Sequence, residues 1–266
     1  MPFSTAIKIS YRNVQRFALL CAMKGQKGIN WLLFCLLALI WGSSFILMKK
    51  SAEQLDGWQI GAVRIFSAAI VFLPPAIFHI RKLPKTKIPI VVLTGLLGNL
   101  FPAFLFGVAI HQKIESSVAG ILNSLTPLFV IIIGAMFFKT KIPAKKVIGV
   151  VIGFIGLFIL SVSKGPVSVS DIGFTLLILL ATLFYGVNVN IVGAYLKGLD
   201  PVKIATVSIA FLLVPTTLVL WLNPVNLTNT EVQYSVLSAV ILGLLGSGAA
   251  TVIFYLLIKK AGGLFA

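Results

Sequence analysis

Acidic residues are scarce in this chain. Only 6 of its 266 residues are Asp or Glu, against 22 Lys or Arg, and charged residues together make up 11%. A soluble domain carries roughly a quarter of charged residues. Apolar residues reach 59%, and lipid accepts apolar surface that a water-soluble core could not hide. The composition therefore predicts an all-α polytopic membrane protein.

Cysteine and histidine are equally rare, with two of each. Cys21 and Cys35 make no disulfide framework. His79 and His111 follow successive apolar runs, so we expect them at opposite membrane faces, about 30 Å apart. That separation excludes a metal site shared between them, and the sequence indicates no cofactor.

Carboxylates deep inside the apolar runs are missing, as is an ATP-binding P-loop. A carboxylate proton relay therefore has no candidate. Serine, histidine and carboxylate residues do not converge on any one run, which disfavours a membrane-embedded enzyme.

The basic residues that give the net charge of +16 gather in short segments between apolar runs, such as Arg81–Lys87, Lys139–Lys146 and Lys259–Lys260. This pattern is typical of cytoplasmic loops of membrane proteins, and it excludes nucleic acid as a partner. The expected partners are the lipid bilayer and a small-molecule substrate. The sequence predicts no oligomeric state.

Eight apolar runs are long enough to cross a bilayer, near residues 30–48, 58–80, 88–110, 115–138, 143–162, 172–194, 203–222 and 235–258. The charges of the connections alternate. With the N-terminus in the cytoplasm, 17 basic residues and one acidic residue lie inside, against four basic and five acidic residues outside. The asymmetry predicts a cytoplasmic N-terminus.

The first 28 residues form a basic lead that we expect in the cytoplasm. Ile7, Tyr11, Val14 and Cys21 fall on one helical face, as in a basic interfacial helix. The alternatives are that the lead is unstructured or that Met23 is the true start. The lead has no clean hydrophobic region or cleavage site, so it fits a signal peptide poorly.

An internal repeat divides the chain. The segment "LDGWQIGAVRI" (Leu55–Ile65) matches "LDPVKIATVSI" (Leu199–Ile209) at an offset of 144, as Trp41 matches Tyr185. The segment "GLLGNLFPAFLFGVAI" (Gly95–Ile110) matches "GLLGSGAATVIFYLLI" (Gly243–Ile258) at an offset of 148. Three matches in order predict a repeat.

Five runs separate the two copies, so the second copy must enter the membrane from the opposite side. This predicts an inverted-topology repeat, as in many secondary transporters. We assign residues 29–165 to a first five-helix repeat and residues 166–266 to a second, incomplete one. Ala266 corresponds to Val118, so eight spans of an expected ten are present. A truncated sequence is the expected reason, and a natural eight-span protein is the alternative.

Arg64 lies inside the span "GWQIGAVRIFSAAIVFLPPA" (Gly57–Ala76), about six residues or roughly 9 Å from its outer end. A long side chain could snorkel that far. An arginine within a span nevertheless costs at least a few kcal/mol, and the matching residue Ser208 is uncharged. We therefore expect Arg64 to face a central cavity and attract a carboxylate or phosphate.

Further candidates for substrate binding or gating are polar residues and a helix breaker within spans. Asn99 lies in the third span and matches Ser247. In the fourth, Pro127 frees the carbonyl of Asn123, which makes a hinge or substrate contact beside Ser124, or else a static kink.

Tyr185 and Asn188 are three residues apart in the sixth span and share a face. They could contact an aromatic or zwitterionic solute, or they could pack in the core. Gly42, Gly149 and Gly153 are expected to allow close helix packing.

Several segments together resemble the EamA-type members of the drug/metabolite transporter superfamily. They are "ALIWGSSFILMK", the arginine of the second span, "ILNSLTPLFVIIIGAMFF" and "KKVIGVVIGFIGLFIL". The resemblance covers Trp31 to the end. It implies ten helices in two inverted five-helix repeats, a bacterial inner-membrane location and transport of small metabolites, often export. One departure is that Lys139 and Thr140 stand where the family usually has Gly-Glu.

The function expected is therefore that of a secondary transporter. It would move small metabolites, amino-acid-like or related solutes, across the inner membrane by alternating access, with export as the expected direction. A lipid-linked sugar flippase and a non-transporting membrane assembly protein are the alternatives.

Overall fold

The computed structural model describes residues 28–112, 114–140, 143–162 and 172–266, and their regular structure is helical throughout. Seven helices in this part of the chain are long and apolar enough to cross a membrane. An eighth, α7 (Ala144–Val162), has 19 residues. The prediction of an all-α polytopic membrane protein is confirmed. The expected basic lead lies outside the described residues.

Each predicted span corresponds to one helix or to a series of joined helices. In chain order they are the N-terminal helix Gly28–Ser51; α2 Gly57–Ile80; η1 Lys85–Lys87, α3 Ile88–Gly95, η2 Leu96–Leu100 and α4 Phe101–His111; α5 Ser116–Asn123 and α6 Thr126–Phe137; α7; α8 Ile172–Tyr195; α9 Pro201–Ala210 and α10 Leu213–Leu222; and α11 Thr230–Ile241, η4 Leu242–Ala249 and α12 Ala250–Ala261.

The last span begins five residues before its predicted start at 235. The reason is local, because the Asn229 side chain caps α11 by accepting a hydrogen bond from the backbone N–H of Glu231 at 2.9 Å. Hydropathy alone does not detect this polar first turn.

The fourth span is broken between α5 and α6. Pro127 has no N–H to donate and stands in the first turn of α6, so the helix ends at Asn123 and restarts at Thr126. The freed Asn123 carbonyl accepts a hydrogen bond from the Thr126 hydroxyl at 2.7 Å. The break is therefore internally satisfied, as the static-kink alternative requires.

Two π-helical segments interrupt the third and eighth spans. Shifted by 148 residues, η2 falls on 244–248, which lies inside η4. The helix caps also match, because Asp56 caps α2 and Asp200 caps α9 at the 144-residue offset. The two copies therefore share local backbone features as well as sequence.

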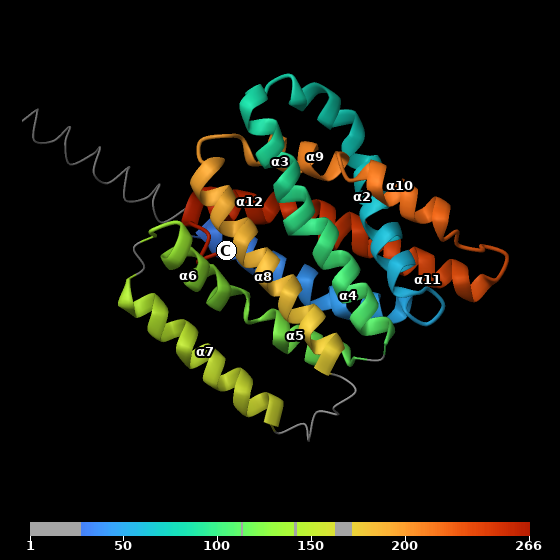
Figure 1. Cartoon of the computed structure of the whole chain (residues 1–266), viewed down its shortest axis with the longest axis horizontal. Coiled ribbons are helices and arrows are strands. Elements are labelled where there is room, and N and C mark those ends of the chain that lie inside the picture. Colours follow the sequence, from blue (N-terminus) through green and yellow to red (C-terminus); the bar gives the residue numbers. More distant parts are fainter. Residues whose placement is uncertain (1–27, 113, 141–142, 163–171) are drawn as a thin grey trace, which may run out of the picture.

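Helix α2 and its repeat counterpart α9–α10 lie side by side and run antiparallel (Figure 1). Asn223, at the end of α10, donates to the Asp56 carboxylate at the start of α2, at 2.6 Å. His79, near the end of α2, lies 2.8 Å from the Thr206 hydroxyl of α9. Antiparallel counterparts are what an inverted repeat requires.

Close contacts between the copies occur in exchanged pairs. A Cβ placed on Gly95 would lie 2.5 Å from the Ser208 carbonyl oxygen, and one on the matching Gly243 would meet the carbonyl oxygen of Arg64, the match of Ser208. Likewise, Gly98 faces Asn188, and their counterparts Gly246 and Ser44 face each other. Such exchange agrees with the predicted inverted repeat.

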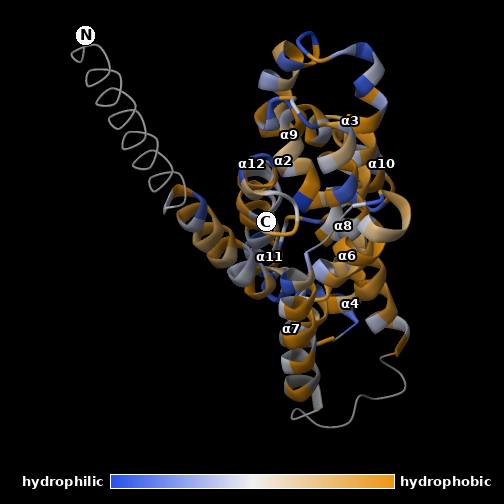
Figure 2. Cartoon of the chain, turned by 90° about the vertical axis from the view of Figure 1, so that its left-hand side faces the viewer, coloured by the Kyte–Doolittle hydropathy of each residue, from blue (hydrophilic) through white to orange (hydrophobic). Residues whose placement is uncertain are grey.

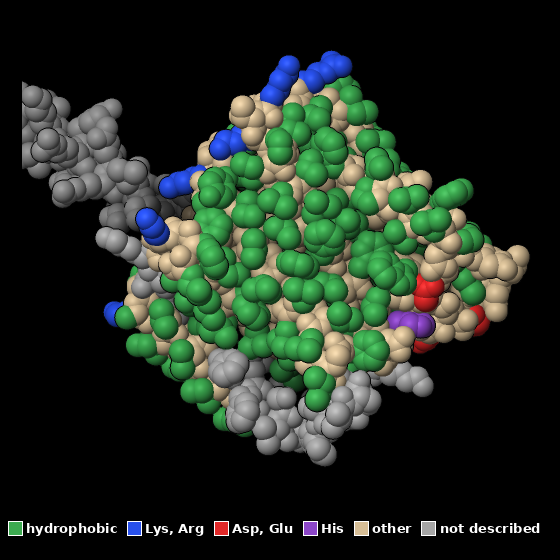
Figure 3. Space-filling model, in the orientation of Figure 1, with side chains coloured by type: hydrophobic (Ala, Val, Ile, Leu, Met, Phe, Trp, Pro, Cys, Tyr) green, Lys and Arg blue, Asp and Glu red, His purple; other side chains and the backbone are tan. Residues whose placement is uncertain are grey.

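Charge separates along the helices. Figure 2 shows hydrophobic residues along them and hydrophilic residues gathered at their ends, most clearly in the loop between α2 and α3. In Figure 3, Lys and Arg lie along one edge of the face and Asp, Glu and His at the opposite edge. We name these the basic end, which includes Arg81–Lys87, and the acidic end, which includes Glu53 and Asp56.

Among the described residues, Gly42, Gly149 and Gly153 have no close helix neighbour, and their expected role in packing stays a prediction. A Cβ on any of the three would meet no described atom within 4 Å. The physical reason is helix placement, because α7 lies at the edge of the bundle (Figure 1), and Ile148, Ile152 and neighbouring isoleucines are more than half exposed. Glycine spacing marks a face that permits packing, without fixing its partner.

Candidate functional site

A cavity of about 230 Å³ lies in the middle of the bundle. We call it the central cavity. Helices from both copies line it: the N-terminal helix, α2, η2, α4, α5 and α6 from the first, and α8 and α12 from the second. The site is therefore assembled by packing of the two copies against each other.

Arg64 supplies the only charged side chain among the described residues that line the central cavity. It is 7% exposed, its Nε donates to the Ser247 hydroxyl of η4 at 2.8 Å, and its guanidinium also hydrogen-bonds with Tyr185. The side chain therefore points inward, and both of these partners belong to the second copy. Snorkelling to the membrane surface is not the conformation observed.

Asn188 and Asn123 place amide groups at the same cavity. The Asn188 Nδ2 donates to the Tyr255 hydroxyl at 3.5 Å, and its Oδ1 is buried with no hydrogen-bond partner among the described residues. The Oδ1 of Asn123 is likewise buried and unpaired within that part of the chain. Buried polar atoms normally have partners, so two exceptions at one cavity indicate a function.

Of the predicted site residues, Arg64, Asn123, Pro127, Tyr185 and Asn188 line the central cavity together. The structure places Asn99 and Ser124 outside the lining of this cavity.

Asn99 lies behind the cavity wall in η2, where its Oδ1 accepts from the Thr251 hydroxyl at 3.0 Å, and Thr251 is the residue that reaches the cavity. Ser124 is exposed away from it and donates back to the Gly120 carbonyl at 3.0 Å.

The aromatic wall of the cavity was missed by sequence reasoning. It includes Trp41, Phe45, Phe106, Phe254 and Tyr255. The Trp41 indole N–H donates to the Gly246 carbonyl at 3.1 Å, within η4, which fixes the ring as part of the wall. The repeat held a usable signal, because Trp41 is the counterpart of Tyr185.

The sequence indicates Ser247 only as the counterpart of Asn99, whereas in the structure its hydroxyl accepts the hydrogen bond from Arg64. The repeat therefore pointed to position 247 as part of the site, but it did not predict that Ser247 would contact Arg64.

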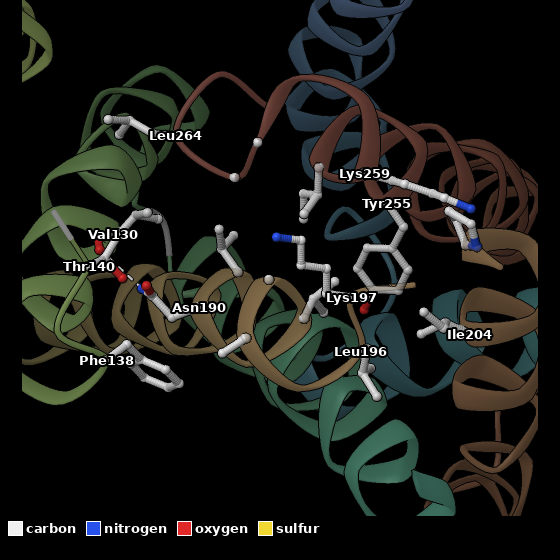
Figure 4. Close-up of a pocket in the computed structure, with 18 of the residues that line it drawn as sticks. Val130, Phe138, Thr140, Asn190, Leu196, Lys197, Ile204, Tyr255, Lys259 and Leu264 are labelled. Atoms are coloured by element: carbon white, nitrogen blue, oxygen red, sulfur yellow. Dashed lines mark hydrogen bonds between the residues drawn. The ribbon is translucent and has the colours of Figure 1, made fainter. Parts of the chain in front are cut away.

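A second cavity of about 520 Å³ leads from the central cavity toward the basic end. We call it the vestibule. The two share five lining residues, Val130, Val189, Tyr255, Gly263 and Leu264. Figure 4 shows the Lys197 amine extending into the vestibule, with Thr140 and Asn190 on one side and Tyr255 on the other. Thr140, where the resemblance implies a glutamate, therefore lines the approach to the central cavity.

The acidic end is tied by hydrogen bonds. The Gln59 amide donates to the Pro224 carbonyl at 3.2 Å, and the Ser235 hydroxyl donates to the Lys50 carbonyl at 3.2 Å. With the bond between Asn223 and Asp56, these contacts join α2, the loop after α10, α11 and the N-terminal helix. The two ends thus differ. The vestibule lies at the basic end, whereas hydrogen bonds join the helices at the acidic end.

Comparison with known proteins gives one family. A model described as the EamA-like transporter family matches residues 28–162, which is half of the chain. A solved crystal structure covers 84% of this chain and 79% of its own, with a TM-score of 0.55 and 16% identity, a likeness that shows the fold alone.

Individual relatives are similar over shorter stretches. An uncharacterized transporter of Archaeoglobus fulgidus is 29% identical over 133 residues, 50% of this chain and 47% of that protein. The uncharacterized inner membrane transporter YedA of Escherichia coli is 28% identical over 146 residues, 54% and 46% respectively. An S-adenosylmethionine uptake transporter of Rickettsia felis is 29% identical over 136 residues, 50% and 44%. The matches span about half the length of these relatives.

Proposed function

Because this multi-pass membrane protein belongs to the EamA-like transporter family, we propose that it is a secondary transporter of small metabolites, amino-acid-like or related solutes. We place it in the bacterial inner membrane with the N-terminus in the cytoplasm. The similarity to YedA, named as an inner membrane transporter, supports the location, and the separation of charge between the two ends supports the orientation.

The observation that carries the proposal is the central cavity with its buried guanidinium. No Asp or Glu side chain of the described chain lines this cavity. A buried charge without a counter-charge costs several kcal/mol, and an anionic group on a substrate would offset that cost. Arg64 is therefore the proposed anchor for the carboxylate or phosphate of the solute.

Alternating access is proposed from the arrangement of the two copies. The exchanged contacts around Arg64, Ser208 and Asn188 support an inverted repeat with the cavity at its centre, which is where such transporters bind substrate. The vestibule joins the cavity to the basic end, and the bonded acidic end is the opposite gate. Rocking of one copy against the other would exchange the two states.

Export is the proposed direction, because the vestibule loads the cavity from the end that we place in the cytoplasm. The name of the Rickettsia felis relative favours uptake as the second candidate, with S-adenosylmethionine as a substrate to include. The family assignment disfavours a membrane assembly protein, and a lipid-linked sugar flippase remains the alternative within transport.

Flux through proteoliposomes tests the proposal. The purified chain is reconstituted, a panel of labelled amino acids, S-adenosylmethionine and unrelated anions is offered, and initial rates are compared with those of Arg64→Ala. We expect flux of at least one solute that the variant loses. A loop variant at the basic end, Arg81→Ala, is the matched control and should transport normally. The absence of flux for every solute with folded protein, or equal flux in Arg64→Ala, would overturn the proposal.

A further inference from the structure

The two ends of the molecule differ in the bonds that join the copies. At the acidic end, three hydrogen bonds connect a side chain of one copy to a group of the other. They run from Asn223 to the Asp56 carboxylate at 2.6 Å, from Gln59 to the Pro224 carbonyl at 3.2 Å and from Ser235 to the Lys50 carbonyl at 3.2 Å. We call these three bonds the outer latch.

Each bond of the outer latch has a counterpart pair at the basic end. The offsets of 144 and 148 residues that relate the copies give these pairs, with the donor named first: His79 and Asp200, Lys203 and the Ile80 carbonyl, and Lys87 and the Ala194 carbonyl. Imidazole and ammonium groups donate hydrogen bonds, as the amides and the hydroxyl of the outer latch do, and the one carboxylate is again a carboxylate. The donor and acceptor roles of all three bonds are therefore preserved in the repeat.

The counterpart bonds are not formed among the described residues. His79 lies 2.8 Å from the Thr206 hydroxyl, which is six residues further along α9 than Asp200. The side chains of Lys87 and Lys203 make no hydrogen bond or ion pair within the described part of the chain. Donors and acceptors for three bonds are thus present at the basic end without being joined.

The unjoined groups border the vestibule. Ala194, in the last turn of α8, lines it, and so does Pro201, which follows Asp200 at the start of α9. Bonds at these positions would draw together the end of α2, the start of α3, the end of α8 and the start of α9. They would narrow the entrance through which the central cavity meets the basic end.

We propose that the three counterpart pairs form an inner latch, which closes the vestibule in the second state of the transporter. The two copies of an inverted repeat can exchange conformations, so the contacts that close one end recur at the other as their counterparts. When the outer latch opens, His79 moves from Thr206 to Asp200, and the two lysines bind the carbonyl groups at the ends of α2 and α8. This inference rests on the proposed alternating access and names the bonds of its second state.

The inner latch carries charged donors where the outer latch has neutral ones. Gln59 and Ser235 donate from an amide and a hydroxyl, whereas Lys203 and Lys87 donate from ammonium groups to carbonyl groups at helix C-termini. A cation is favoured at a helix C-terminus, and salt screens this attraction. The second state should therefore be less populated as the salt concentration at the basic end rises.

A single cysteine in the vestibule tests the inner latch. Val192 is buried and lines the vestibule but not the central cavity, so the rate at which Val192→Cys reacts with a thiol reagent follows the opening of the basic end. Cys21 and Cys35 are replaced by serine in every chain used. Gln59→Ala with Ser235→Ala weakens the outer latch and should lower this rate about fivefold or more, because the state with the closed vestibule gains population.

The counterpart changes should act in the opposite sense. Lys203→Ala with Lys87→Ala, introduced into the chain with the weakened outer latch, should restore the rate, because the second state then loses its own bonds. Lys85→Ala, an exposed lysine of the same loop that belongs to neither latch, is the control and should restore nothing. The inner latch is refuted if the outer changes leave the rate unaltered, if the two lysine changes fail to restore it, or if Lys85→Ala restores it equally well.

Salt provides an independent readout in the chain with the weakened outer latch. Between about 0.05 and about 0.5 M NaCl, the lowered rate should rise about twofold or more, because the charged donors are screened. Lys203→Gln with Lys87→Ser places the residues of the outer latch at the inner positions. This variant should keep the low rate and lose the salt effect, and a salt effect of the same size would contradict the charged latch.

The proposed function and the inner latch can fail separately. If the reaction rates follow the expected pattern and no solute moves in proteoliposomes, the latch stands and the proposal of transport is wrong. If Arg64-dependent flux is measured and the reaction rate is the same in all the variants, transport stands and the latch is wrong.

Discussion

A guanidinium inside a membrane span needs partners that water would otherwise provide. Arg64 has the Ser247 hydroxyl and Tyr185, both neutral, as partners, and no Asp or Glu side chain of the described chain lines the cavity with it. Its charge is therefore hydrogen-bonded but not neutralised. At the scale of single residues, the buried charge of Arg64 lowers the stability of the protein. A role in ligand binding would explain why it is there.

Replacement of Arg64 should accordingly separate function from stability. We expect Arg64→Ala to reduce the initial transport rate about tenfold or more, because a charge-assisted hydrogen bond to the substrate is lost. The thermal stability should stay equal or rise, because a buried charge is removed. Arg64→Lys should rescue little, since an ammonium lacks the planar fork that binds a carboxylate in two places.

Rates in proteoliposomes and melting curves of the same samples check this prediction. A variant Arg64→Ala that transports at the normal rate would show that the residue is not a substrate anchor.

Two glycines provide a matched pair for packing. A Cβ on Gly243 would meet the Arg64 carbonyl oxygen and the Ser67 hydroxyl, whereas one on Gly149 would meet no described atom within 4 Å. Gly243→Ala should destabilise the protein by about 1–3 kcal/mol, the range for overpacking. Gly149→Ala should be neutral or stabilising by up to about 1 kcal/mol, because alanine favours helix. The free energy of unfolding of each variant is measured by denaturation in detergent. Equal changes for both variants would contradict the assignment of the contact faces.

At the scale of elements, the interruptions lie beside the site. The break between α5 and α6 and the π-helical segments η2 and η4 all contribute residues to the central cavity or hold residues that do. At such interruptions the regular i→i−4 ladder of hydrogen bonds is disturbed, and helices bend there. We therefore expect these three points to move during transport.

The α5–α6 break offers a direct test of movement. Pro127→Ala restores a backbone donor, so the two helices can join and the break should stiffen. We expect a lower transport rate with unchanged or increased thermal stability. A static kink predicts instead that the rate is unaffected. Pro84→Ala, in the exposed loop between α2 and α3, serves as the control proline and should leave the rate unchanged.

At the scale of the whole molecule, the separation of charge predicts which end faces the cytoplasm. Cysteine accessibility tests this prediction. Single cysteines are introduced into a variant in which Cys21 and Cys35 are replaced by serine. Pro84→Cys, at the basic end, should react with an impermeant thiol reagent only after the cells are permeabilised. Asn226→Cys, at the acidic end, should react in intact cells. The reverse pattern would invert the topology and with it the proposed direction of transport.

The sequence by itself determined the features that depend on local composition and on counting along the chain. Apolar runs predicted the spans, because a helix that crosses lipid must be apolar over its length. Matching residues such as Asp56 and Asp200 predicted the repeat, and their equal role as helix caps agrees with it. The odd number of spans between the copies then predicted antiparallel counterparts, as α2 and α9–α10 are.

Only the tertiary structure decided which face of each helix meets the cavity. Asn99 and Ser124 carry polar groups like those of Asn188, and yet one lies behind Thr251 and the other faces away. Gly149 permits close packing and meets no described neighbour. Rotation of a helix about its axis is set by the residues packed against it, which lie far away in the chain. The aromatic wall and the hydrogen bond from Arg64 to Ser247 arise in the same way, from contacts between the two copies.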